Sequence, residues 1–523
     1  MNPLIGIDLG TTYSCLAGMI EGAAKVIPNL EGAATTPSMV CLASTGETLV
    51  GNLAMRQSLT NPERTLFAIK RLIGQKFGSA RVQEARRHLP YALVEAANGD
   101  VQVKVGERRI TPQEVSALIL GYLKKSAEAY YGTAVREAVV TVPAHFDDNQ
   151  RQATKDAALI AGLDVLRVIN EPTAASLAYG LHRKRAGKVA VFDMGGGTFD
   201  ITLLEISEGV FHVLATAGDS YLGGEDFDRR LVDWLLTEFK RETREDLSGD
   251  KYALQRIKEA AEKAKRELSF TQESEINLPF IASASVGSRH LRRTLTRPLL
   301  EELTRDLVEK AFPLVEGALA EAGLRPGEIE DIILVGGQTR MPLLRRQVAD
   351  FFGRAPNDHL NPDEGVALGA AIQAGILSGE MSEIVLLLDV TSLSLGIEIE
   401  QDGFERIIEK NATLPVRKTK PFTTVEDGQR RVRIHVLQGE SGKASENTSL
   451  GMFDLVGISA ASAGIPQIDV TFEIDVNGMV RVSARDTVSG REQKMVVEPS
   501  SGLSRSQKNE IMKQASAEGA KNG

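Results

Sequence analysis

The sequence is poor in cysteine and in aromatic residues, and it contains no long apolar run. Its two cysteines, Cys15 and Cys41, both lie in apolar surroundings. This predicts buried thiols in a reducing compartment rather than a disulfide or a catalytic thiol. No apolar run approaches the roughly 20 residues that span a bilayer. The first strand-like segment begins at Leu4, which leaves no room for a signal peptide. We therefore expect a soluble, cytoplasmic protein with no membrane partner.

The charge balance is mildly acidic. Lysine and arginine total 61 against 70 aspartate and glutamate residues, a formal net charge of −9. No basic tract occurs beyond short ones such as Arg430-Arg431, so nucleic acid is not expected as a principal partner. The sequence also lacks the Walker A, HExxH and nucleophile-elbow motifs. A length of 523 residues predicts two to four domains.

What the sequence does contain is a strand followed by glycines between two carboxylates. Residues 188–192 read as a buried strand that ends at Asp193, and Gly195, Gly196 and Gly197 follow before Asp200. Without a Cβ, these glycines let backbone N–H groups come close to an anion. The two carboxylates fit such a site if Mg²⁺ and its waters lie between them. Alone, the pattern also fits an ordinary hairpin turn.

The same pattern occurs near the N-terminus. Residues 4–7 are apolar, and Asp8, Gly10, Thr11 and Thr12 follow. Two strand–Asp–Gly–Thr turns, one opening each half of a long N-terminal region, predict two related lobes whose loops face one nucleotide. This is the plan of the actin-like ATPase superfamily, which the sequence resembles here.

The periodicity changes along the chain. The N-terminal part alternates strands and helices, whereas the C-terminal part shows strand alternation, most clearly at Ile468, Val470, Phe472, Ile474 and Val476 around an Asn477-Gly478 turn. An apolar segment at residues 384–390 joins the two parts. We predict an α/β region over 1–378 with lobes of about 1–185 and 186–378, a linker over 379–390, a β-sandwich over 391–502 and the start of a helical region over 503–523.

Three further features allow either a structural or a functional interpretation. Lys70 fits a surface lysine whose stem lies on apolar residues, and Glu171 fits a helix cap before Pro172. A helix predicted between Ile257 and Phe270 places four polar residues on one face, which is typical of a solvated face or of a shelf for a purine and its ribose. These four are Glu262, Lys265, Arg266 and Ser269.

Several motifs in order resemble the 70-kilodalton heat-shock-protein chaperones, the DnaK-like family, along nearly the whole chain. They lie at residues 5–15, 192–200, 334–342, 385–390 and 436–440. The resemblance implies an actin-like two-lobed ATPase domain, a β-sandwich that binds peptide, and an ATP-dependent chaperone. It implies a slow ATPase that peptide and a J-domain co-chaperone stimulate, with a nucleotide exchange factor as a further partner.

The resemblance also assigns residues to the nucleotide. ATP or ADP would be held with Mg²⁺ and K⁺, and Asp8, Asp193 and Asp200 would hold these cations through waters. Lys70 and Glu171 would orient the attacking water, with Asp8, Asp193 and Thr198 completing the catalytic set. The nucleotide-binding set comprises Gly10, Thr11, Thr12, Tyr13, Gly195, Gly196, Gly197, Thr198, Gly223, Gly224, Glu262, Lys265, Arg266, Ser269, Gly336, Gly337, Arg340 and Asp363.

Two more sets follow from the resemblance. Pro143 and Arg151 would relay the nucleotide state, while Arg167 and the segment Leu386, Leu387, Leu388 and Asp389 would report to the J-domain partner. An extended apolar peptide would lie in a cleft with main-chain hydrogen bonds and one apolar pocket. The cleft residues would be Ile397, Phe422, Val432, Ile434 and Ile468, although alternation alone also fits core residues of a sandwich.

Three departures from the family pattern stand out. Glu400 replaces the usual apolar residue that arches over the peptide opposite Val425, which suggests altered substrate preference, including tolerance of basic peptides. Ser392 replaces a proline after the linker, so domain docking is expected to differ. Most of the helical lid is missing, which fits either a shortened chain or a short HscC-like branch, and a lidless cleft should exchange peptide quickly.

Three other classes share the ATPase plan. A filament-forming actin relative would not explain the linker and the β-region. A sugar or acetate kinase would need a small-molecule pocket between the lobes. A co-chaperone that exchanges nucleotide with little hydrolysis is disfavoured because Lys70, Glu171 and Thr198 are all present.

Overall fold

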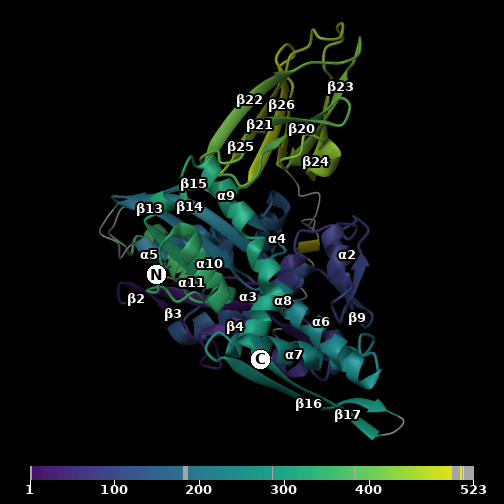
Figure 1. The fold of residues 1–523 in the computed structure, drawn as a ribbon. Helices are drawn as coiled ribbons and strands as arrows, with labels where there is room; N and C mark the ends of the chain where they lie inside the picture. The colour runs from purple at the N-terminus through teal and green to yellow at the C-terminus, as the bar shows by residue number, and fades with distance from the viewer. Residues whose placement is uncertain are drawn as a thin grey trace.

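The computed structural model describes residues 3–180, 186–284, 287–381, 385–496, 507–508 and 511. Two mixed sheets organise the first 390 residues, and an all-β part stands on top of them (Figure 1). The change between the two occurs after α11 (Gly365–Ser378) and before β20 (Leu395–Ile399). In the described part of the chain, no helix is long and apolar enough to cross a membrane.

The first lobe is built on a six-stranded sheet of order β12-β11-β1-β2-β3, with β4 paired to β2. Strand β1 runs parallel to β11 and antiparallel to β2, so the turn after Asp8 lies at the carboxyl end of an inner strand. The strands are β1 (Leu4–Asp8), β2 (Tyr13–Ile20), β3 (Ala23–Val26), β4 (Thr35–Pro37), β11 (Glu137–Val142) and β12 (Asp164–Asn170). Helices α3 (Pro112–Tyr131), α4 (Asp148–Ile160) and α5 (Glu171–Gly180) accompany them.

The rest of the first lobe is an attached subdomain. It contains two three-stranded sheets, β6-β5-β7 and β10-β9-β8, whose apolar faces join one core with α3. Its elements are β5 (Val40–Leu42), β6 (Thr48–Val50), α1 (Asn52–Gln57), β7 (Thr65–Leu66), the 3-10 turn η2 (Ile69–Arg71), α2 (Ala80–Arg86), β8 (Ala92–Glu95), β9 (Val101–Val105) and β10 (Arg108–Ile110).

The second lobe repeats this plan on a five-stranded sheet of order β18-β13-β14-β15-β19. Strand β13 runs parallel to β18 and antiparallel to β14, as β1 does with β11 and β2, and Asp193 pairs with Asp200 across the β13–β14 turn. The strands are β13 (Gly187–Met194), β14 (Phe199–Ser207), β15 (Val210–Asp219), β18 (Asp331–Val335) and β19 (Leu386–Leu388). The two sheets therefore share one four-strand arrangement, β11-β1-β2-β3 in the first and β18-β13-β14-β15 in the second.

Helices cover the second lobe and join it to the first. Helices α5 and α11 contribute to one apolar cluster with strands of both sheets. A long hairpin of β16 (Glu273–Ala284) and β17 (Gly287–Thr296) projects from the second lobe (Figure 1). The remaining elements are α6 (Gly224–Thr243), α7 (Lys251–Glu267), α8 (Arg297–Glu309), α9 (Phe312–Glu321), the turn η4 (Gly337–Arg340) and α10 (Pro342–Phe352).

The C-terminal part is a sandwich of two four-stranded sheets, β21-β20-β23-β24 and β22-β25-β26-β27, around one apolar core. We call these eight strands the sandwich. Besides β20, they are β21 (Gly403–Ile408), β22 (Val416–Phe422), β23 (Arg431–Gln438), β24 (Thr448–Val456), β25 (Ile468–Ile474), β26 (Val480–Asp486) and β27 (Glu492–Val496).

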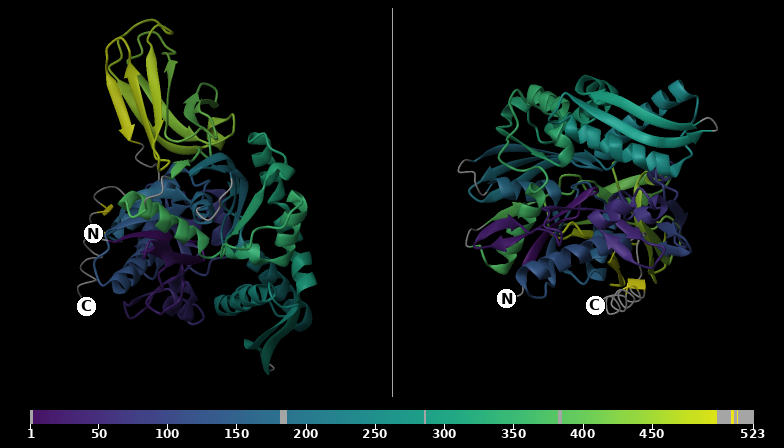
Figure 2. Two further views of the ribbon diagram at one scale, coloured as in Figure 1. Left: turned by 90° about the vertical axis from the view of Figure 1, so that its left-hand side faces the viewer. Right: turned by 90° about the horizontal axis from the view of Figure 1, so that it is seen from below.

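The sandwich lies against the lobes (Figure 2), and hydrogen bonds join them. The backbone N–H of Val480 donates to the carboxylate of Asp148 over 2.9 Å, and the N–H of Asp148 donates to Gln438 over 3.1 Å. On the other lobe, Glu321 accepts from Lys410 over 2.7 Å and from Asn411 over 2.8 Å. The linker strand β19 pairs parallel with the start of β15, so the connection itself is part of the second sheet.

The sequence-based expectations need some corrections. The helix expected to begin at Ile257 begins at Lys251, because Asp250 caps it by accepting hydrogen bonds from Tyr252 and Ala253. Val476 was expected on the buried face but is 43% exposed, because β25 ends at Ile474 and the turn begins there. Both cysteines are free and buried. The expected helical start over 503–523, and with it the lid, falls almost wholly outside the described residues.

Candidate functional site

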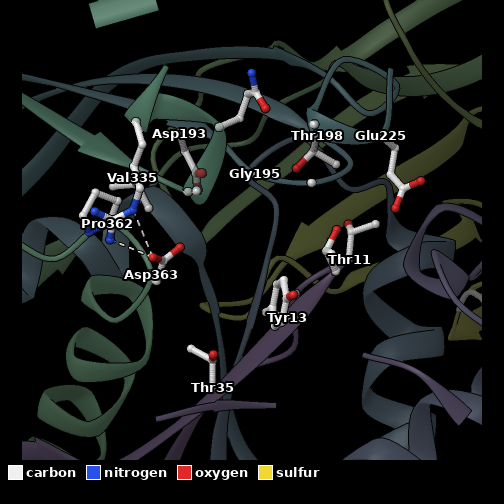
Figure 3. Close-up of a pocket in the computed structure, with 18 of the residues that line it drawn as sticks. Thr11, Tyr13, Thr35, Asp193, Gly195, Thr198, Glu225, Val335, Pro362 and Asp363 are labelled. Atoms are coloured by element: carbon white, nitrogen blue, oxygen red, sulfur yellow. Dashed lines mark hydrogen bonds and ion pairs between the residues drawn. The ribbon is translucent and has the colours of Figure 1, made fainter. Parts of the chain in front are cut away.

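A cavity of about 400 Å³ lies between the two lobes, at the ends of β1 and β13. Asp8, the last residue of β1, and Asp193, near the end of β13, both line it. Figure 3 shows Thr11, Asp193, Gly195 and Thr198 around this space. Of the predicted nucleotide residues, the cavity is lined by Asp8, Gly10, Thr11, Thr12, Tyr13, Lys70, Glu171, Asp193, Gly195, Gly196, Thr198, Gly224, Glu262, Lys265, Arg266, Ser269, Gly336, Gly337, Arg340 and Asp363.

The two glycine turns approach each other so closely that side chains would not fit. A Cβ on Gly196 would lie 1.9 Å from the hydroxyl oxygen of Thr12, and one on Gly197 would lie 2.5 Å from that of Thr11. Gly197 and Gly223 do not line the cavity themselves, because Gly223 packs directly against the backbone of the 195–197 turn. The glycines thus allow turns from both lobes to close on one space.

Buried carboxylates lie at the cavity: Asp8 and Asp193 line it, whereas Asp200, predicted with them, does not line it and pairs with Asp193 across the β13–β14 turn. Burial and the nearby charge of Glu171 raise the pKa of Asp8 to about 7 and that of Asp200 to about 8. Burial, Glu171 and Asp200 likewise raise the pKa of Asp193 well above its usual range. Lys70 lowers the pKa of all three, and Arg151 also lowers that of Asp200. When these carboxylates are ionised, they outnumber the cations beside them, so an added cation would stabilise their ionised form.

These carboxylates fit cations held through water. Among the described residues, no group of three or more His, Cys, Asp or Glu side chains is placed to hold a metal ion directly. One carboxylate oxygen of Asp200, Oδ2, is buried without a hydrogen-bond partner in the part of the chain that the structure describes. An orphaned oxygen beside surplus negative charge suits a hydrated cation, because Mg²⁺ keeps several waters and binds through few carboxylates.

Lys70 and Glu171 form a buried ion pair beside this cluster. Lys70 lies on the turn η2, which follows Ala68 in the left-handed conformation, and its ammonium is 5.8 Å from the centre of the Phe146 ring. Glu171 is the first residue of α5, directly after β12. The surface reading of Lys70 is wrong, since only 7% of this residue is exposed.

The opposite wall of the cavity comes from α7 and from the loops around β18. Lys265 forms an ion pair with Asp228 over 2.8 Å and donates to the carbonyl of Gly224 over 2.9 Å. Arg266 donates to the hydroxyl of Tyr13 over 2.9 Å. Arg340 donates to Asp363 over 2.7 Å, which the dashed lines in Figure 3 mark. The polar face of α7 therefore turns toward the cavity, and a fully solvated face is excluded.

Sequence reasoning missed a second cation at the turns, Arg71. Its guanidinium donates to the carbonyl of Gly197 over 2.8 and 3.1 Å and pairs with Asp226 over 2.5 Å. Arg71 belongs to the first lobe and both partners belong to the second, so one side chain joins the turn at residues 195–197 to the first lobe. The available signal was a pair of cations, Lys70 and Arg71, in an otherwise apolar segment.

The predicted coupling residues lie between the cavity and the sandwich. Arg151 is buried and donates to the carbonyl of Ala144 over 2.9 Å and to Asn170 over 2.7 Å. Asn170 in turn donates to Asp389 at the end of the linker. Arg167 is partly buried near Asp389, and burial lowers the pKa of its guanidinium. Pro143 ends the strand that leads into this region, and Leu386 to Leu388 form β19.

The predicted peptide residues divide by burial. Ile397, Ile434 and Ile468 are buried in the sandwich core, while Phe422 and Val432 pack against it and are partly exposed. Glu400 and Val425 are exposed. In this docked arrangement, the three buried isoleucines act as core residues. The alternating sequence pattern was compatible with either cleft or core.

A comparison with protein families agrees with this architecture. The family model described as Hsp70 protein matches residues 4–522, nearly the whole chain. A mixed α/β part with two related sheets followed by a β-sandwich fits an actin-like ATPase joined to a sandwich domain.

Proposed function

Because the chain belongs to the Hsp70 family, a family of ATP-binding chaperones of protein folding and the stress response, we propose that it is an ATP-dependent chaperone for extended apolar segments of unfolded polypeptides. Its affinity for these segments is switched by ATP binding and hydrolysis. The observation that carries the proposal is the single cavity lined by both acidic glycine turns, connected through α5 to a linker that is itself a strand of the second sheet.

The proposed division of labour follows from where the side chains lie. The backbone of the two turns holds the phosphates, with Thr11, Thr12 and Thr198 beside it. Lys70 and Glu171 orient a water for attack, because phosphoryl transfer depends on positioning and charge stabilisation more than on covalent chemistry. A bound Mg²⁺, with K⁺ beside it, would neutralise charge on the phosphates, held through waters by Asp8, Asp193 and Asp200.

Coupling to the sandwich proceeds along α5 and the linker. Glu171 begins α5, Asn170 precedes it, and both Asn170 and Thr173 donate to the Asp389 carboxylate. A shift of Glu171 toward or away from the nucleotide therefore changes the hydrogen bonds that hold the linker. A ligand that favours one arrangement of this chain of contacts shifts the docking equilibrium of the sandwich. J-domain co-chaperones and an exchange factor are the partners that we expect to act on it.

The peptide site lies in the sandwich. Binding there combines main-chain hydrogen bonds with one apolar pocket, which gives broad recognition of extended chains. The partly exposed Phe422 and Val432, with Glu400 and Val425 at exposed positions, are the residues that we assign to its accessible surface. The buried Ile397, Ile434 and Ile468 would support it from below unless the sandwich rearranges on undocking.

The experiment is single-turnover hydrolysis of ATP with and without an extended apolar peptide. We expect slow hydrolysis that the peptide accelerates, with no phosphorylated small-molecule product. Hydrolysis that depends on a sugar or acetate acceptor would instead identify a kinase, and acceleration by self-assembly would identify a filament protein. A chain that binds ATP without hydrolysing it would support the co-chaperone reading.

A further inference from the structure

His145 contacts one of the proposed cation-binding carboxylates from outside the cavity. Its ring Nδ1 lies 3.0 Å from Oδ1 of Asp200, and the side chains of the two residues are 17% and 1% exposed. His145 belongs to the loop between β11 and α4, in the first lobe, while Asp200 lies on β14 in the second. The contact therefore crosses the interface between the lobes directly behind the site.

The fold leaves a place for this ring. Gly218 pairs with Asp200 across β14 and β15, and a Cβ on Gly218 would lie 2.5 Å from the Nδ1 and Cε1 atoms of His145. A side chain at position 218 would push the ring off the carboxylate. The imidazole is thus held between a strand backbone and the carboxylate oxygen, with little freedom to turn.

The direction of this hydrogen bond follows from the carboxylate. A neutral imidazole carries one N–H, and an ionised Asp200 can only accept a hydrogen bond. When a cation near Asp200 favours its ionised form, the contact therefore requires the tautomer with the proton on Nδ1.

We propose that His145 is a positioning residue for the cation site: by donating its Nδ1–H to Oδ1 of Asp200, it aims Oδ2 at the hydrated cation. Two observations meet in this assignment. Oδ1 has a donor, whereas Oδ2 is buried without one among the described residues, so the carboxylate has one oxygen fixed and the other left for a ligand. The assignment rests on the proposed function, because it needs a cation-dependent nucleotide site.

The location of His145 extends this role to docking. Two residues further along the chain, Asp147 caps α4, and Asp148 exchanges hydrogen bonds with Val480 and Gln438 of the sandwich. The loop that carries the imidazole is thus the same loop that contacts the sandwich. A cation that moves Asp200 would therefore move this loop through His145.

The test compares donor-free and donor-keeping variants by calorimetric binding of ADP, with Mg²⁺ and with EDTA. His145→Phe keeps a ring against Gly218 but removes the donor, and His145→Leu is a second donor-free variant. His145→Asn places an amide N–H near the position of Nδ1. Mg²⁺ should raise the ADP affinity of the wild type, and this increase should be about tenfold smaller in the donor-free variants, because they lack one hydrogen bond to a charged group. Their ADP affinity in EDTA should stay as in the wild type, and His145→Asn should recover most of the gain.

The outcomes separate the two proposals. An unchanged Mg²⁺-dependent gain in both donor-free variants would overturn the positioning role, as would equal losses in His145→Asn and His145→Phe. A loss of ADP affinity in EDTA as well would mark a merely structural residue. A wild-type chain that binds no ADP with Mg²⁺ would overturn the proposed function, and this assignment with it.

Discussion

Asn170 donates a hydrogen bond of 2.9 Å from its side-chain amide to the carboxylate of Asp389. Thr173 donates to the same oxygen over 3.0 Å, and all three side chains are buried. The residue that follows the linker strand is therefore bonded to residues on either side of Glu171. This short path joins the proposed catalytic site to the linker.

Removing the linker carboxylate should release the sandwich. In Asp389→Ala, two buried donors lose their acceptor, which costs about 1–3 kcal/mol each. We expect faster deuterium exchange at the backbone amides of β19 and a lower docked fraction in ATP. Glu473→Ala, at an exposed site on β25, is the matched control. Protection of β19 equal to that of the wild type would show that the backbone pairing alone holds the linker.

Arg71 should control how long nucleotide stays bound. Arg71→Lys keeps the charge but loses the planar fork that reaches both Gly197 and Asp226. Losing one charge-assisted hydrogen bond, at about 1.5–3 kcal/mol, predicts ADP release roughly 10- to 100-fold faster. Stopped-flow release of a fluorescent ADP measures this rate. Arg87→Ala changes an arginine whose side chain is 74% exposed and should leave the rate unaltered, so a similar effect there would contradict the assignment.

Cation binding should release protons near neutral pH. Asp8 and Asp200 have pKa values raised to about 7 and about 8, so each is partly protonated at pH 7 in the free site. A bound cation favours the ionised form and lowers these pKa values, so the protons leave. Calorimetry of Mg·ADP binding in buffers of different ionisation enthalpy should detect this release at pH 7 and lose it above about pH 9.

The control for that experiment is Asp200→Asn, which cannot ionise at this position. It should release fewer protons than the wild type at pH 7, and ADP without Mg²⁺ should release fewer in both proteins. Absence of proton release on Mg·ADP binding at pH 7 would contradict the raised pKa values, since carboxylates that are already ionised in the free site have no protons to lose.

Glu400 should favour basic peptides. It is exposed between β20 and β21, so a peptide cation near it gains about 0.2–1 kcal/mol. Matched basic and acidic peptides should then differ in affinity by roughly two- to fivefold, with the difference reduced in Glu400→Ala and at high salt. Fluorescence anisotropy measures both affinities. Equal affinities for basic and acidic peptides, unchanged in Glu400→Ala, would contradict a preference for basic peptides.

The strands and turns of the site could be predicted because local chemistry specifies them. The apolar run before Asp193, the glycines after it, and its repeat at Asp8 identify two strand ends whatever surrounds them. The burial of Lys70 could not be read from its neighbours, because it depends on Glu171, 101 residues away in the sequence. Only the fold brings such partners together.

Alternation was a weaker guide in the sandwich. It identified β25 through Ile474 but carried the pattern one step too far, to Val476, because a strand end has no signal in the period itself. It also could not separate cleft from core, as Ile434 and Ile468 illustrate. Arg71 escaped notice for a related reason: its partners Gly197 and Asp226 belong to the other lobe.

The parallel pairing of β19 with β15 has a consequence for the undocked molecule. Residues 386–388 cover the outer edge of the second sheet at positions 210–212. If the linker leaves, that edge is bare, and bare strand edges invite pairing with any extended chain. The linker thus protects the sheet edge as well as connecting the two parts of the chain. A variant whose linker stays undocked should self-associate through this edge.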